Sequence, residues 1–114
     1  MKLHSAIFYT NNIGKVFPFY TKTLGFDIEY RQGDSYISFI FNNDSRLGIK
    51  VKEKEREIPG KQTVIIEVKD IKKDYDRLKK KSIPFYKELQ IESWGITFSI
   101  LDPDGNKIEF VQKK

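Results

Sequence analysis

The sequence predicts an α+β domain in which two tandem βαβββ modules carry curved mixed sheets that enclose a cleft. Strand, helix and three strand patterns follow one another, and the same order restarts after a charged linker over residues 53–60. Residues at the start of the first half align with residues at the start of the second half, and each of these pairs is separated by the same number of positions. The 114 residues suit a single domain and leave little room for a second core. We therefore expect one domain over residues 1–114, with modules of about 1–55 and about 60–114.

The first module opens with an expected strand over residues 4–10, which are rich in β-branched and aromatic types. A helix is expected over residues 13–24, where apolar side chains recur at helical spacing. Asn12 can cap its start and Gly25 its end. Pro18 lies inside this segment and predicts a kink or a later start. Three strands should follow, separated by turn residues, over 26–31, 36–42 and 47–52.

The second module repeats this order. A strand is expected over residues 61–68, and a lysine-rich helix over residues 71–81 follows the capping residue Asp70. Pro84 ends that helix region. Three short strands should follow, with a tight Asp-Pro-Asp-Gly turn before the last one, around residues 85–89, 95–101 and 107–112.

An internal repeat supports the two-module interpretation. Ser5 aligns with Thr63 at an offset of 58, and four further pairs share that offset: Ala6 with Val64, Phe8 with Ile66, Asn12 with Asp70, and Ile13 with Ile71. In the last strands Ile49 aligns with Ile108 at an offset of 59, which implies one inserted residue. Because one helix can cover only one face of its sheet, the other faces are free to form a cavity.

The composition excludes several kinds of chemistry and several locations. The chain has no cysteine, so a disulfide framework, a thiolate nucleophile and Cys-ligated metal are excluded. The segment Met1 to Ser5 is too short and polar for a signal peptide, and no apolar run approaches the roughly 20 residues that span a bilayer. We expect a cytoplasmic protein that does not use a membrane as its partner.

The net charge of +5 and the pI of about 9.3 raise the question of a nucleic-acid partner. Much of the positive charge lies on the helix expected over residues 71–81, where such residues usually form a solvated face. No stacking motif or recognition helix accompanies it. We therefore expect no nucleic-acid partner.

Strand alternation separates the two faces of each sheet. One face is uniformly apolar and is the expected core side: Leu47, Ile49, Val51, Val64, Ile66, Val68, Ile108 and Phe110. The other face mixes apolar and polar groups, as small-molecule sites do. It carries the candidate ligand-binding residues Ser5, Ile7, Tyr9, Lys50, Thr63, Ile65, Glu67 and Glu109, together with Gly48, Lys107 and Val111.

Two segments resemble the vicinal oxygen chelate superfamily of glyoxalases, extradiol ring-cleaving dioxygenases and bleomycin-resistance proteins. They are Phe19-Tyr-Thr-Lys-Thr-Leu-Gly-Phe26 and the more specific Trp94-Gly-Ile-Thr-Phe-Ser-Ile-Leu-Asp-Pro-Asp-Gly-Asn-Lys-Ile-Glu-Phe110. The resemblance covers nearly the whole chain and is closest to the metal-free bleomycin-resistance-like members. It implies that Trp94 lies at the mouth of the cleft, where such members use aromatic side chains to hold planar ligands.

The resemblance also implies where a metal would bind. Metal-dependent members use one ligand on the first strand and one on the last strand of each module, which correspond here to Ser5, Lys50, Thr63 and Glu109. Only Glu109 offers a carboxylate, whereas a catalytic divalent site needs about three protein ligands. His4, the only histidine, lies on the other face of its strand by alternation. We therefore expect no metal and no cofactor.

No catalytic residues are identified. Strand alternation places His4 on the face opposite Ser5, so Ser5 has no histidine base beside it. Whether Glu67 and Glu109 form a carboxylate pair depends on geometry that sequence does not supply. Lys50 and Glu109 are expected to face each other and to pair or to meet a charged ligand, because an unpaired buried charge is costly.

The preferred function is therefore a metal-free protein that binds a small organic ligand in the cleft. Because the chain is basic, we expect that ligand to be neutral or anionic. The family resemblance and an exposed sheet edge favour a homodimer. The alternative is a divalent-metal-dependent lyase, isomerase or dioxygenase of the same superfamily.

Overall fold

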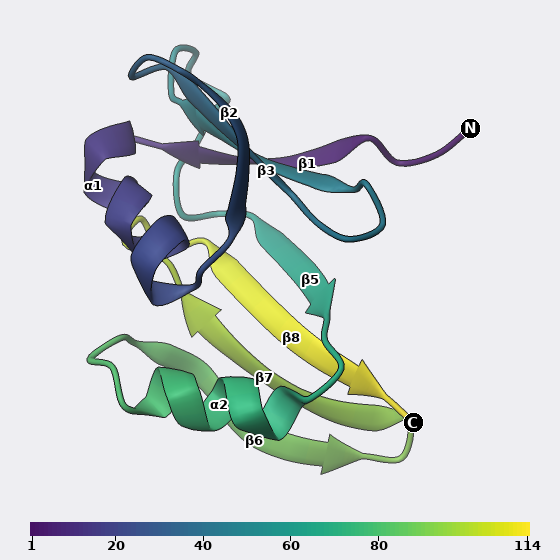
Figure 1. The fold of residues 1–114 in the computed structure, drawn as a ribbon. Coiled ribbons are helices and arrows are strands. Elements are labelled where there is room, and N and C mark those ends of the chain that lie inside the picture. The colour runs from purple at the N-terminus through teal and green to yellow at the C-terminus, as the bar shows by residue number, and fades with distance from the viewer.

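The computed structural model describes residues 1–114 and contains two βαβββ modules (Figure 1). The first module comprises β1 (Ser5–Thr10), α1 (Ile13–Pro18), the π-helical turn η1 (Phe19–Thr23), β2 (Asp27–Gln32), β3 (Tyr36–Ile40) and β4 (Arg46–Val51). The second comprises β5 (Thr63–Glu67), α2 (Ile71–Lys79), β6 (Phe85–Glu92), β7 (Gly95–Leu101) and β8 (Lys107–Lys113). No helix combines the length and apolar character needed to cross a bilayer.

The two sheets share one topology. Their strand orders are β1-β4-β3-β2 and β5-β8-β7-β6. In each sheet the first and last strands of the module pair in parallel, and the remaining neighbours are antiparallel. A parallel pair needs a crossover connection, which the helix and the two intervening strands supply. The predicted α+β class and the tandem βαβββ architecture are therefore confirmed.

The register corrects the repeat alignment at the last strands. Ile7 lies opposite Gly48 in the first sheet, and its repeat partner Ile65 lies opposite Glu109 in the second. Gly48 is thus the equivalent of Glu109, at an offset of 61, and Lys50 corresponds to Val111. The predicted offset of 59 is wrong by two residues. Because an even shift leaves every side chain on the same face of its strand, the assignment of the faces survives the error.

Pro18 changes the character of the first helix. The proline ends α1, and the chain continues as η1, in which the Leu24 N–H donates to the Phe19 carbonyl at 2.9 Å. A proline has no N–H to donate and its ring crowds the preceding turn, so the α-helical ladder is interrupted there. The helix begins at Ile13, directly after its cap Asn12, so a later start is not observed; after the proline the hydrogen bonding changes to the wider i to i+5 pattern.

One hydrophobic core serves both modules. A single cluster of 16 buried residues includes Phe8 and Tyr20 from the first module and Leu78 and Phe98 from the second. The apolar faces predicted from alternation are the core faces: Leu47, Ile49, Ile108 and Phe110 are buried, and Val51, Val64, Ile66 and Val68 pack against them. The helix side of each sheet therefore faces the shared core.

The turn between β7 and β8 joins the two modules. Asn106 is fully buried; its Nδ2 donates to the Tyr9 carbonyl at 3.1 Å, and its Oδ1 accepts from the Gly60 N–H at 2.9 Å. Asp102 accepts from the Tyr20 hydroxyl at 2.6 Å and from Asn106 Nδ2 at 3.1 Å. Burial raises the pKa of both the Asp102 carboxyl and the Tyr20 phenol. First module, linker and second module thus meet at one turn, through its buried residues Asp102 and Asn106.

The linker folds back onto the end of β4. Glu57 is buried, and its carboxylate accepts from the backbone N–H groups of Glu53 at 2.9 Å and Lys54 at 3.3 Å. It also pairs with Lys50 Nζ at 2.8 Å. The hydrogen bond from Lys50, followed by those from the backbone, lowers the pKa of Glu57 to about 2. Lys50 therefore anchors the linker.

Tyr20→Phe should lower the free energy of unfolding by about 1–3 kcal/mol, because it removes a donor from a buried carboxylate without changing the shape of the side chain. Burial raises the pKa of Asp102, so ionising it costs folding free energy as pH rises from 3.8 through the raised value. The hydrogen bond from the Tyr20 hydroxyl stabilises the ionised Asp102 carboxylate more than the protonated one. Urea unfolding should therefore show a larger loss at neutral pH than near pH 3.8, and the exposed Tyr86→Phe should show neither effect.

Glu57→Gln should remove a pH dependence of stability. The folded pKa of about 2 lies below the ordinary 4.5, so the ionised carboxylate stabilises the fold above pH 4.5, and this contribution is lost as pH falls toward 2. The thermal unfolding midpoint of the wild-type protein should thus decline more steeply than that of the variant across this interval. Glu55→Gln, in the exposed part of the same linker, is the control. Parallel curves for all three proteins would contradict the assignment.

Candidate functional site

The sheet faces opposite the core carry the residues identified as ligand-binding candidates. Those on the first sheet are partly buried: Ser5, Ile7, Tyr9 and Lys50. On the second sheet Thr63, Ile65 and Glu67 are exposed, Glu109 is partly buried, and Trp94 is exposed in the turn between β6 and β7. All nine therefore lie outside the helix-covered side.

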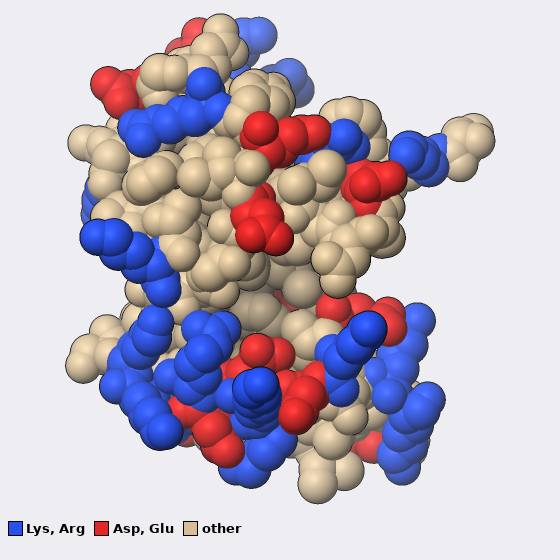
Figure 2. Space-filling model, viewed as in Figure 1, with Lys and Arg blue, Asp and Glu red and all other residues tan.

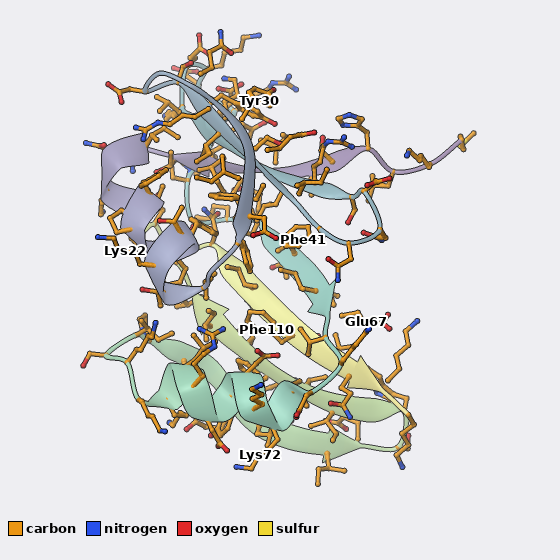
Figure 3. The ribbon with its side chains drawn as sticks, in the orientation of Figure 1. Lys22, Tyr30, Phe41, Glu67, Lys72 and Phe110 are labelled. Carbon is orange, nitrogen blue, oxygen red and sulfur yellow. The ribbon has the colours of Figure 1, made fainter.

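The structure gathers these candidates into two groups, one on each sheet. Tyr9 lies opposite Lys50 on the first sheet, and Ile65 lies opposite Glu109 on the second. Figure 3 shows Tyr30 of the first module and Glu67 of the second at well-separated places on the molecule. Two surface hollows are each lined by residues of a single module.

The predicted pairing of Lys50 with Glu109 is wrong. Lys50 Nζ lies 2.8 Å from Glu57 Oε1 and 2.9 Å from Glu53 Oε1. The ion-pair partner of Glu109 is its strand neighbour Lys107, at 3.9 Å. The error came from the repeat alignment, which placed Lys50 two residues away from its true equivalent, and from the linker, whose alternating charges had the pattern of a solvated segment. The hydrogen bond to Glu57, and then that to Glu53, raises the pKa of Lys50.

An open hollow of about 390 Å³ lies on the uncovered side of the first sheet, next to Lys50. It is lined by Tyr30, Gln32, Ser35, Tyr36, Lys50 and Glu53. The rings of Tyr30 and Tyr36 lie 5.8 Å apart. Aromatic surface beside a few polar groups is the usual composition of a small-molecule site. Five of these residues were missed from sequence, because faces had been assigned only to the first and last strands of each module.

Gly48 makes room for one wall of this hollow. A Cβ at this position would overlap the Tyr36 hydroxyl and the end of the Ile7 side chain. Burial raises the pKa of Tyr36, which keeps its phenol protonated and able to donate a hydrogen bond. The glycine at the position equivalent to Glu109 thus allows the Tyr36 ring to lie against β4.

The four positions that could hold a metal are poor in ligands. With the observed register they are Ser5, Gly48, Thr63 and Glu109. Only Glu109 carries a carboxylate, and nowhere in the chain do three His, Cys, Asp or Glu side chains converge. His4 precedes β1 and is exposed. Since a divalent catalytic site needs about three such ligands, the residues present do not fit a catalytic metal.

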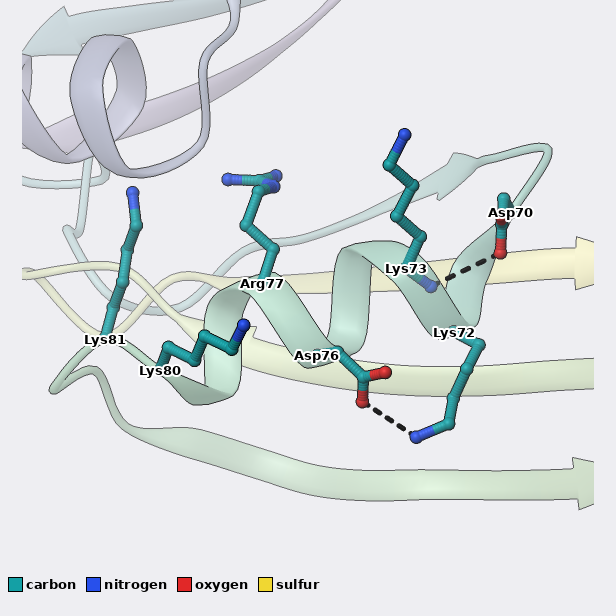
Figure 4. A pocket seen from close by; sticks show the side chains of 7 residues that line it. All are labelled: Asp70, Lys72, Lys73, Asp76, Arg77, Lys80 and Lys81. Carbon is teal, nitrogen blue, oxygen red and sulfur yellow. Dashed lines mark hydrogen bonds and ion pairs between the residues drawn. The ribbon is translucent and has the colours of Figure 1, made fainter.

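A second hollow, of about 790 Å³, lies along α2 and is lined by polar residues alone: Asp70, Lys72, Lys73, Asp76, Arg77, Lys80 and Lys81 (Figure 4). Figure 2 shows basic side chains gathered on this module, beside the recess between the modules. Lys72 pairs with Asp76 at 2.7 Å, and Arg77 donates to the Thr23 carbonyl at 2.8 Å. These bonds engage part of the basic face, and the absence of apolar lining distinguishes it from a small-molecule pocket.

Solved structures share this fold over the full chain. TnmS3, an antibiotic binding protein from Streptomyces sp. CB03234, superposes with a TM-score of 0.88 at 22% identity, covering 100% of this chain and 97% of that one. A lactoylglutathione lyase from Agrobacterium tumefaciens gives a TM-score of 0.80 at 15% identity, with coverages of 97% and 92%. TioX from Micromonospora sp. ML1 gives 0.82 at 13% identity, with 100% of both chains covered. At such identities the likeness establishes the fold alone.

The family is established by a sequence comparison. A search of curated proteins finds no match. The model of the Glyoxalase/Bleomycin resistance protein/Dioxygenase superfamily matches residues 2–110, which include the first module, the joining turn and the second module as far as Phe110 in β8. The repeated βαβββ topology and the match over nearly the whole sequence lead to one conclusion: the chain belongs to the glyoxalase/bleomycin resistance protein/dioxygenase superfamily.

Proposed function

We propose that this chain is a metal-free, non-catalytic protein that binds a small organic molecule against the uncovered faces of its sheets. The observation that carries the proposal is the ligand set at the four candidate metal positions, where Ser5, Gly48 and Thr63 accompany a single carboxylate, Glu109. Lewis-acid chemistry has too few protein ligands there. The same faces offer aromatic and polar groups suited to binding, and a cysteine-free chain suits a cytoplasmic location.

The expected ligand is neutral or anionic. A net charge of +5 disfavours long-range attraction of a cationic molecule. The likeness to TnmS3, whose description is an antibiotic binding protein, supports ligand binding as a use to which this fold is put. Since fold does not determine function, the argument rests on the residues of the site and not on the likeness.

A homodimer is the second part of the proposal. The uncovered face of the second sheet and its turn leave large apolar side chains in solvent, with Ile65 63%, Tyr86 62% and Trp94 54% exposed. Large apolar side chains exposed to solvent are candidates for contact with a partner. A second copy of the chain, related by a two-fold axis, could cover this surface with the first sheet and its hollow. The nine candidate residues would then line a cleft shared between two chains.

Native protein should carry an organic molecule or none, and no stoichiometric divalent metal. Native mass spectrometry, extraction of the denatured protein and elemental analysis of the same sample provide the measurement. One metal ion per chain that disappears in Glu109→Gln would overturn the metal-free assignment. A small aromatic or amphipathic molecule released on denaturation would support the binding function and identify the ligand.

Ile65→Arg should convert the dimer to a monomer, because a charge on the covered surface would be desolvated without a partner. Sedimentation velocity at micromolar concentration measures the change. Ile58→Arg is the matched control, since Ile58 is an exposed isoleucine of the linker, outside the proposed interface. A wild-type protein that sediments as a monomer would refute the shared cleft.

A further inference from the structure

The two carboxylates that pair with Lys50 are held very differently. Glu57 is 6% exposed in its side chain and accepts two backbone N–H groups besides the ammonium of Lys50. Glu53 is 69% exposed in its side chain and contacts the ammonium at 2.9 Å. Glu57 is therefore a fixed partner of Lys50, and Glu53 is one that solvent can reach.

An exposed ion pair contributes little net stability, because its Coulomb energy is offset by hydration, screening and side-chain entropy. Swinging Glu53 into water therefore costs little. An incoming anion could then take its place on Lys50, whose side chain is 29% exposed. The exchange replaces one negative charge by another, so the charge balance around Lys50 and Glu57 is unchanged. The Glu53 carboxylate can therefore be exchanged for an external anion on the Lys50 ammonium.

The residues around the Glu53 carboxylate suit the binding of an aromatic ring system. The position of this carboxylate opens into the hollow of about 390 Å³, where Tyr30 and Tyr36 present two phenol rings. Tyr30 is exposed and Tyr36 partly buried, so a flat molecule can lie on their surfaces. Gln32 and Ser35 complete the lining and add hydrogen-bonding groups. An aromatic ring placed there has its acidic substituent directed at Lys50.

We infer that the hollow beside Lys50 binds an aromatic acid, whose anionic group replaces the Glu53 carboxylate on the Lys50 ammonium while its ring lies against Tyr30 and Tyr36. The inference rests on the proposed small-molecule-binding function and narrows its ligand to planar anions. A cation at the same place would meet the ammonium of Lys50. Lys52, Lys54 and Arg56 nearby are matched in number by Glu53, Glu55 and Glu57, so the preference for an anion rests on the Lys50 ammonium.

The test uses two probes of one shape, the anion β-naphthoate and the neutral β-naphthamide, titrated calorimetrically into the full-length protein at neutral pH and low salt. Naphthoate should bind at least roughly tenfold more tightly than naphthamide, because only the anion forms a charge-assisted hydrogen bond with Lys50. Added salt should reduce this preference, since the pair is partly exposed.

Glu53→Gln should tighten naphthoate binding several-fold, because the competing internal carboxylate is gone, and should leave naphthamide unaffected. The double variant Lys50→Met with Glu57→Gln should abolish the preference for the anion. It removes both charges together, so no buried charge is stranded and the fold is retained. Lys54→Met, which removes an exposed ammonium of the same linker, should leave the preference in place.

Equal affinities for the two probes would overturn the inference, as would an unchanged naphthoate affinity in Glu53→Gln. Absence of binding by both probes at millimolar concentration would also overturn it. The proposed function fails separately, through a stoichiometric metal in the native protein. Binding of both probes without charge selection would refute the aromatic acid while keeping a small-molecule site.

Discussion

The turn from Asp102 to Asn106, whose two end residues are buried, is the constraint on which the arrangement of the two modules depends. Asn106 bonds to the first sheet through the Tyr9 carbonyl and to the linker through the Gly60 N–H. Asp102 holds the Tyr20 hydroxyl of the first helical region. Buried polar groups are costly when unpaired, so the turn, the linker and the first module must meet in one geometry to satisfy them together. The short Asp-Pro-Asp-Gly-Asn sequence thereby reverses the chain between β7 and β8 and also fixes the second module to the linker and the first module.

This geometry decides which faces are available for binding. Since the helix side of each sheet contributes to one core of 16 residues, the opposite faces stay outside that core. The second of these faces exposes Ile65 and Tyr86, whereas the first carries the hollow lined by Tyr30 and Tyr36. In our proposal, each of these faces forms part of a binding surface that a second copy of the chain completes. The physical reason for a dimer in our proposal is that two copies can complete both surfaces at once.

The linker contributes to the site as well as to connectivity. Glu57 holds Lys50 in place at the edge of the hollow, and the ammonium also contacts the Glu53 carboxylate and the Val51 carbonyl. A lysine held in this way is a fixed cation with one exchangeable contact. At the position equivalent to Glu109, Gly48 leaves room for the Tyr36 ring. At this one of the four positions that the family resemblance assigns to metal ligands, the chain has a glycine, and the Tyr36 hydroxyl lies beside it.

The sequence by itself determined the fold class, the two-module repeat and the sides of the strands, because alternation of apolar residues and helix caps are local patterns that tertiary packing did not override. Eight of the nine candidate residues lie in strands on the uncovered faces, and Trp94 lies in the turn between β6 and β7; their role in ligand binding stays a prediction. The partner of Lys50, the equivalence of Gly48 with Glu109, and the hollow on β2 and β3 depended on the tertiary structure. The modules differ in loop length before their last strands, and register across such a difference is set by strand pairing. The Glu57 contact arises because the linker folds back onto β4, which a run of alternating charges does not reveal.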